Sequence, residues 1–305
     1  MFVNKISLLV DDGFILASQQ YQGSNLFFLE LFCVEPYLIL NKLLENTRYV
    51  FIGSSIGNIK MFESLLKINF SEKYTYIDDK TENIYLTNVS STNAKNNSFY
   101  GEIIRKLCRN VPDGIICYFS SISLMEYYIK KWNEQDVINS IMNDKLLFIE
   151  EQDPIKLTHI LVNYKKACDL GRGGLLFLST RNRAALNDIF TDHQSRCIVF
   201  IGFPIETKLT KKFEFKLENI KKQFNIDNKE YLNFDTFKLF STKISEKISS
   251  IYDKKVLVIL DEKLMSDKLK DYLPEWLKKI MHIDYDKENI NTDERLKNIK
   301  KFLDN

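Results

Sequence analysis

Hydroxyl side chains stand where the apolar run Ile115 to Phe119 gives way to a segment with helical periodicity: Ser120, Ser121 and Ser123. Hydroxyls and free backbone N–H groups at the start of a helix suit an anion such as one phosphate group. A simpler interpretation is that a serine caps the helix, which needs no ligand. Local sequence favours capping, and the anion site stays open as the alternative.

A glycine-rich stretch, Gly171 to Gly174, has the composition of a phosphate loop but not its context. It precedes an apolar run instead of following one, and the sequence contains no Gly-Lys-Ser or Gly-Lys-Thr. We therefore interpret it as a turn.

Metal chemistry finds no support in the ligand spacing. The five cysteines are scattered and form no Cys-x-x-Cys pair: Cys33, Cys108, Cys117, Cys168 and Cys197. The histidines are isolated: His159, His193 and His282. We expect reduced, mostly buried thiols and no metal site.

Lysines gather between Lys208 and Phe224, interleaved with glutamates at helical spacing. A solvated, salt-bridged helix face is the simpler interpretation. A nucleic-acid backbone is the alternative, because the lysines outnumber the glutamates.

Composition is that of a folded globular protein, with 45% hydrophobic residues among 305. The 43 Lys and Arg nearly cancel the 41 Asp and Glu to leave +2, which excludes a polybasic arm. No apolar run reaches the roughly 18–20 residues that span a bilayer, and Met1 to Val10 lacks the pattern of a secretory signal. We expect an intracellular protein without a membrane partner.

The elements that position the residues discussed above are short apolar runs that alternate with helical segments. The runs are Ile115 to Phe119, Leu146 to Ile149, Leu175 to Leu178, Cys197 to Ile201 and Val256 to Leu260. This alternation predicts an α/β fold with a parallel sheet sandwiched by helices over residues 101–305. Residues 1–70 are expected to be a small α+β unit, with a buried strand at Tyr49 to Ile52, and residues 71–100 a linker with one possible strand at Ile84 to Leu86.

Several motifs occur together in this frame: Val111 to Phe119, Met125-Glu126, Trp132 to Gln135, Lys145 to Glu150, Asn163 to Cys168, Gly171 to Gly173, Ile201 to Pro204, and Leu273 to Trp276. Together they resemble the second motor domain of the XPD-type helicases of transcription factor IIH. The resemblance implies a RecA-like fold for residues 101–305, with residues 1–70 as a remnant of the first motor domain.

Membership of that family implies a superfamily 2 DNA helicase of nucleotide excision repair and transcription initiation, located in the nucleus. The family's cofactors are ATP, Mg²⁺ and an iron–sulfur cluster. The phosphate loop that binds ATP and the cysteines that hold the cluster belong to the first half of the family's proteins, so we expect no cofactor in this chain. The implied partners are subunits of transcription factor IIH, above all its von Willebrand A-like regulatory subunit, and single-stranded DNA.

Specific residues carry these implications. At positions matching the family, Ser121, Ser123 and Arg181 are expected to contact nucleic acid, and Trp276 to dock the regulatory subunit. No catalytic residue is expected.

The family's Gln-x-x-Gly-Arg-x-x-Arg motif is degenerate here, with Thr242, Ser245, Glu246 and Ser249 at its four defining positions. Both arginines that reach the γ-phosphate are missing, and such an arginine contributes on the order of 10³–10⁵ in rate. The Ser-Glu-Gly-Ile-Asp-Phe motif is likewise replaced by Ala185 to Phe190.

Three hypotheses remain. The first is a catalytically degenerate scaffold in a repair and transcription complex. The second is the second lobe of an active, split 5′–3′ helicase whose first lobe is another polypeptide. The third is a nucleic-acid-binding module without motor function.

Overall fold

A computed structural model describes residues 14–20, 27–75, 83–88, 97–182, 190, 192–202, 210–248, 254–261, 270–285 and 292–304. Its centre is a six-stranded sheet in the order β3-β8-β7-β4-β6-β5. Every neighbouring pair in this sheet is parallel. The strands are β3 (Ile84–Asn88), β4 (Gly114–Phe119), β5 (Leu146–Ile149), β6 (Gly174–Ser179), β7 (Cys197–Ile201) and β8 (Lys255–Leu260). The predicted α/β sandwich is confirmed.

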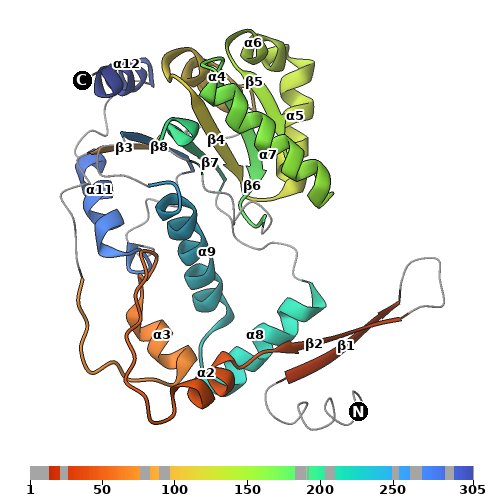
Figure 1. The fold of residues 1–305 in the computed structure, drawn as a ribbon, viewed down its shortest axis with the longest axis vertical. Helices are drawn as coiled ribbons and strands as arrows, with labels where there is room; N and C mark the ends of the chain where they lie inside the picture. Colours follow the sequence, from red (N-terminus) through yellow and green to blue (C-terminus); the bar gives the residue numbers. More distant parts are fainter. Residues whose placement is uncertain are drawn as a thin grey trace.

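Helices cover both faces of this sheet (Figure 1). One face packs against α4 (Asn97–Asn110), α5 (Ile122–Glu134), α6 (Val137–Asp144) and α12 (Thr292–Asp304). The other packs against α7 (Pro154–Asp169), α9 (Asn228–Ser245) and α11 (Glu275–Tyr285). Within β4, Ile116 and Tyr118 point to the second layer, whereas Ile115, Cys117 and Phe119 point to the first. Because both faces are covered, the strands are continuously apolar.

The stretch expected to be a linker contributes the edge strand β3. Its residues pair in parallel with β8, with Ile84 beside Lys255 and Asn88 beside Ile259. Arg295 of α12 reaches back to this strand and donates to the hydroxyl of Thr87 at 2.9 Å. The sheet therefore needs residues 84–88, although the division of the chain into three parts stays a prediction.

The N-terminal part is a ribbon followed by two helices. β1 (Phe14–Gln20) and β2 (Phe27–Cys33) pair antiparallel, and α2 (Pro36–Leu44) and α3 (Ile59–Leu66) follow. The turn signal Asp11-Asp12-Gly13 between two short apolar runs predicts a β-hairpin of residues 6–10 and 14–17, and the first arm of that hairpin lies outside the described residues.

The expected buried strand from Tyr49 to Ile52 is wrong. This segment is irregular, and Val50 and Ile52 are 84% and 93% exposed. Burying an apolar strand requires a sheet to receive it, and none of the described residues pairs with the backbone of this segment.

α3 joins the N-terminal part to the C-terminal part through a small apolar cluster. Met61 is buried against Leu217 and Ile220 of α8 (Lys211–Phe224) and against Phe234 of α9. The loop before α3 touches the segment leading into α11, where a Cβ on Gly57 would lie 1.9 Å from the carbonyl oxygen of Tyr272. Glycine at position 57 is what allows this backbone contact.

Candidate nucleic-acid and nucleotide site at the strand ends

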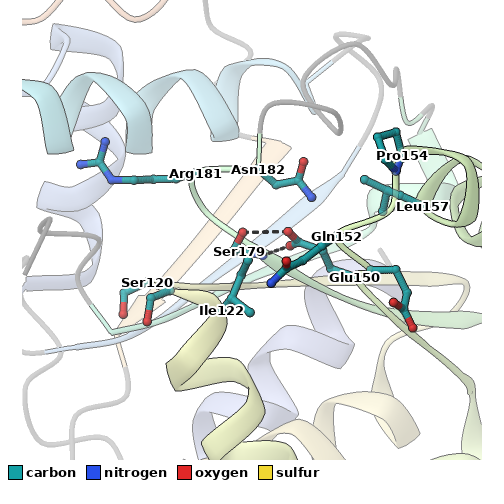
Figure 2. A pocket seen from close by; sticks show the side chains of 11 residues that line it. Ser120, Ile122, Glu150, Gln152, Pro154, Leu157, Ser179, Arg181 and Asn182 are labelled. Carbon is teal, nitrogen blue, oxygen red and sulfur yellow. Dashed lines mark hydrogen bonds between the residues drawn. The ribbon is translucent and has the colours of Figure 1, made fainter. Parts of the chain in front are cut away.

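A pocket of about 380 Å³ opens at the carboxyl ends of β4, β5 and β6 (Figure 2). Ligands bind open parallel sheets at this edge. The lining is a mixture of hydroxyls, carboxylates, amides and apolar groups: Ser120, Ser121, Ile122, Glu150, Glu151, Gln152, Pro154, Leu157, Ser179, Arg181 and Asn182. The structure thus brings Ser121 and Arg181 together on one concave surface, and their contact with nucleic acid stays a prediction.

Ser121 serves as the N-cap of α5. Its hydroxyl oxygen accepts a hydrogen bond from the backbone N–H of Leu124 at 3.2 Å. This is the simpler of the two interpretations of the serine cluster, and it leaves Ser121 at the pocket rim. Ser123 is exposed in the first turn of α5 and is not part of the pocket lining.

Glu150 organises the floor of the pocket. Its carboxylate accepts the backbone N–H of Ser179 and, at 3.0 Å, the hydroxyl of the same residue. Withdrawal from water raises the pKa of Glu150, and the bonds from Ser179 oppose that shift only in part. The hydrogen bonds from Ser179 therefore hold the carboxyl group of Glu150 in place, whereas burial makes its ionised form unfavourable.

Arg181 is already engaged with a carboxylate of the chain. Its Nη1 lies 3.0 Å from Oδ2 of Asp235 on α9, and both side chains are partly buried. Figure 2 shows its guanidinium pointing away from Glu150 and Ser179. With Glu150 and Glu151 also lining the pocket, the charge here is not that of a strong phosphate site.

At the degenerate arginine motif, the hydroxyl side chains donate hydrogen bonds to backbone carbonyls of their own helix. The hydroxyl of Thr242 donates to the carbonyl of Lys238 at 2.8 Å, and that of Ser245 donates to Thr242 at 3.1 Å. Glu246 is half-buried, and its Oε2 is fully buried with no hydrogen-bond partner among the described residues. Ser249 lies outside the described residues, as do residues 185–189 of the other altered motif.

A lysine that sequence reasoning missed lies beside Glu246. Lys243 is completely buried, with its Nζ 3.4 Å from the carbonyl oxygen of Asn182 and 5.6 Å from the ring centre of Tyr118. Burial lowers its pKa, while the carboxylates of Glu246 and Glu150 act in the opposite direction. The ammonium group of Lys243 therefore interacts with the carboxylates of Glu246 and Glu150 of its own chain.

These positions do not fit the γ-phosphate of ATP. Where the family places an arginine, the chain directs a carboxylate inward, and a carboxylate repels a triphosphate. Lys243 offers the opposite charge but is shielded from solvent. We derive no phosphoryl-transfer step through this site.

Metal ligands are also not assembled in the part of the chain that the structure describes. No group of three or more His, Cys, Asp or Glu side chains there has the arrangement to hold a metal ion. Four of the five cysteines are buried and Cys33 is half-buried, all as free thiols. Burial raises the pKa of Cys108 to about 12, so it is a thiol and not a thiolate ligand. Nor is any helix in the described ranges long and apolar enough to cross a bilayer.

Trp276 is half-buried at the start of α11 and packs against the core. Its indole N–H donates to the carbonyl of Ser54 at 2.7 Å. The side chain therefore ties the loop before α3 to α11, and this is a structural role within the chain.

The turn at Gly171 to Gly173 is confirmed. Gly171 and Gly173 have φ of +73° and +74°. Between them, the guanidinium of Arg172 donates to the carbonyls of Asp144 and Met142 at 2.7 and 3.1 Å. Its task is to cap the C-terminal end of α6.

Comparison with known proteins identifies the domain that carries this geometry. The profile of the helicase C-terminal domain matches residues 104–280, which is more than half of the chain. The chain belongs to this family.

Relatives of this helicase C-terminal domain include XPD subunits of transcription factor IIH. It is 31% identical over 204 residues to the transcription and DNA repair factor IIH helicase subunit XPD of Dictyostelium discoideum, covering 67% of this chain and 26% of that protein. The XPD subunit of Schizosaccharomyces pombe is 24% identical over 95% of this chain and 40% of its own length. The chain thus spans well under half of these curated relatives.

A solved XPD helicase has the same fold, with a TM-score of 0.53 at 14% identity, covering 91% of this chain and 49% of that one. The XPD-type resemblance and the RecA-like fold of the helicase C-terminal domain are thereby confirmed.

Proposed function

We propose that this chain is a catalytically degenerate helicase C-terminal domain that serves as a scaffold in a complex of the transcription factor IIH kind, in nucleotide excision repair and transcription initiation in the nucleus. The proposal rests on the position of Glu246. A residue that must present a cation to ATP is replaced by a carboxylate whose Oε2 is buried beside Lys243. The sheet and both helical layers are nevertheless retained.

Docking on the von Willebrand A-like regulatory subunit is the partner interaction that we propose. Named relatives are subunits of transcription factor IIH, and the family-like segment Leu273 to Trp276 is retained here. Because the indole N–H of Trp276 is used by Ser54, the side chain would act by holding the α11 surface in shape. Its role in docking is then that of a positioning residue.

Co-expression with that regulatory subunit tests the scaffold. We expect a stable complex with the whole chain, weakened by Trp276→Ala while circular dichroism shows an intact fold. Tyr74→Ala is the matched control, because Tyr74 is 88% exposed outside the apolar clusters. If the two proteins fail to associate, the scaffold proposal loses its partner.

Contact with single-stranded DNA at Ser121, Ser123 and Arg181 belongs to the same proposal. Binding there should be weak, salt-sensitive and indifferent to base sequence, because the cation is paired with Asp235 and carboxylates line the pocket. Arg181→Ala should weaken binding to all sequences alike. A strong base preference would contradict this.

The second lobe of a split helicase is a second candidate, favoured by the exposed apolar segment Tyr49 to Ile52. Such a segment suits pairing with the sheet of another lobe. Co-purification of a second polypeptide with a phosphate loop, together with ATPase activity, would support this candidate over the scaffold.

A further inference from the structure

A solvent-facing aromatic ring on α8 lies outside the strand-end pocket and outside the proposed scaffold role. Phe215 is 49% exposed, although α8 has a well-defined buried face formed by Leu217 and Ile220. At 100° per residue, Phe215 projects almost opposite that face. Core packing therefore does not account for a phenylalanine here.

Lysines flank this ring on the same side of the helix. Lys211 precedes Phe215 by four residues and Lys222 follows it by seven, so the three side chains form one stripe, and both lysines are exposed. At 1.5 Å per residue the stripe is about 16 Å long. A stripe of this length has room for a few nucleotides of a single strand.

Two other lysines of α8, Lys212 and Lys216, face aromatic rings of the chain. Nζ of Lys212 lies 4.7 Å from the ring centre of Phe32 on β2, and Nζ of Lys216 lies 5.2 Å from that of Tyr231 on α9. These contacts hold α8 against the ribbon and α9. The outward charge is thus carried by Lys211, Lys222 and the adjacent exposed Lys221.

Two glutamates moderate the charge. Glu214 and Glu218 lie on the exposed side, and the five lysines of α8 leave it a net charge of +3. Glu218 lies between Phe215 and Lys222 on the stripe, where it would repel a phosphate backbone.

We propose that the Lys211–Phe215–Lys222 stripe of α8 is a binding site for single-stranded nucleic acid. The ring of Phe215 stacks on a base, and the lysine ammonium groups contact the phosphates on either side. Flat aromatic surface next to cations is the combination that single-stranded nucleic acid requires. The site does not use the strand-end pocket, so Arg181 is not part of it.

Fluorescence anisotropy of the full chain with a labelled 20-nucleotide oligothymidine tests the proposal. Phe215→Ala should weaken binding about 5- to 150-fold, the range of one lost stacking contact. Lys211→Ala should lower the slope of log affinity against log salt by about 0.7, as loss of one phosphate contact does on a single strand. Glu218→Gln should strengthen binding about two- to threefold, because it removes a repulsive charge several ångströms away.

Tyr74→Ala is the control for loss of an exposed aromatic ring and should leave affinity unchanged. Unchanged affinity in Phe215→Ala, with the fold intact by circular dichroism, would overturn the proposal. So would a Phe215-dependent association with vesicles of 30% phosphatidylserine that exceeds binding to the oligonucleotide. Complex formation with the regulatory subunit is measured separately, so failure here is distinguishable from failure of the scaffold role.

Discussion

Substituting Gly57 by alanine should detach the loop before α3 from α11. The new Cβ would lie 1.9 Å from the carbonyl oxygen of Tyr272, whereas a carbon–oxygen contact needs about 3.3 Å. The loop therefore has to retreat by about 1.4 Å. Such a displacement breaks the bond of 2.7 Å between the indole N–H of Trp276 and the carbonyl of Ser54.

The expected cost follows from these losses. Overpacking against a backbone atom costs about 1–3 kcal/mol, and the hydrogen bond about 1 kcal/mol. The reduced freedom of the unfolded chain returns about 0.4–1 kcal/mol. We expect Gly57→Ala to lower the free energy of unfolding by about 1–3.5 kcal/mol.

Urea unfolding and tryptophan fluorescence provide the assay. The chain has two tryptophans, and Trp132 is fully buried in the core, so a red shift of the native emission reports on Trp276. Gly53→Ala in the same loop is the matched control, because its Cβ meets only the side chain of Ile56, at 3.1 Å. If both variants show the same stability and the same emission, the loop is not held as described.

Two further variants test other parts of the fold. Met61→Ala should lower the free energy of unfolding in urea by about 2–3 kcal/mol, because it leaves a cavity between α3, α8 and α9, whereas Leu43→Ala at a largely exposed position should cost less than about 0.5 kcal/mol. Glu150→Gln tests the raised pKa of Glu150. A carboxyl group whose folded pKa exceeds its ordinary value of 4.5 stabilises the fold at low pH, and this stabilisation is lost as the pH rises through the folded pKa. The wild type should therefore lose stability relative to Glu150→Gln from about pH 4 to 7, and a pH-independent difference would contradict the raised pKa.

Buried strands were the most predictable part of this molecule. Runs such as Ile115 to Phe119 are apolar at every position because helices cover both faces of the sheet, and that pattern is local in sequence. The run from Tyr49 to Ile52 has the same composition but is exposed, since burial depends on a neighbouring sheet that composition does not encode.

Pairings across long sequence separations were beyond prediction. The contact of Glu150 with Ser179 spans 29 residues and that of Arg181 with Asp235 spans 54. Capping by Ser121 was predictable because it involves only the next three residues. The surroundings of Glu246 were predictable only in part. The sequence showed that an arginine is missing at this position, but not that the buried Lys243 lies beside it.

ATP turnover by the purified chain tests the central claim most directly. The measurement is phosphate release with and without single-stranded DNA, compared with a blank that lacks protein. With a carboxylate directed inward at Glu246, where the family has an arginine, we predict no release above the blank under either condition. DNA-stimulated turnover that follows the chain through successive purification steps, with no second polypeptide present, would contradict the degenerate-scaffold account.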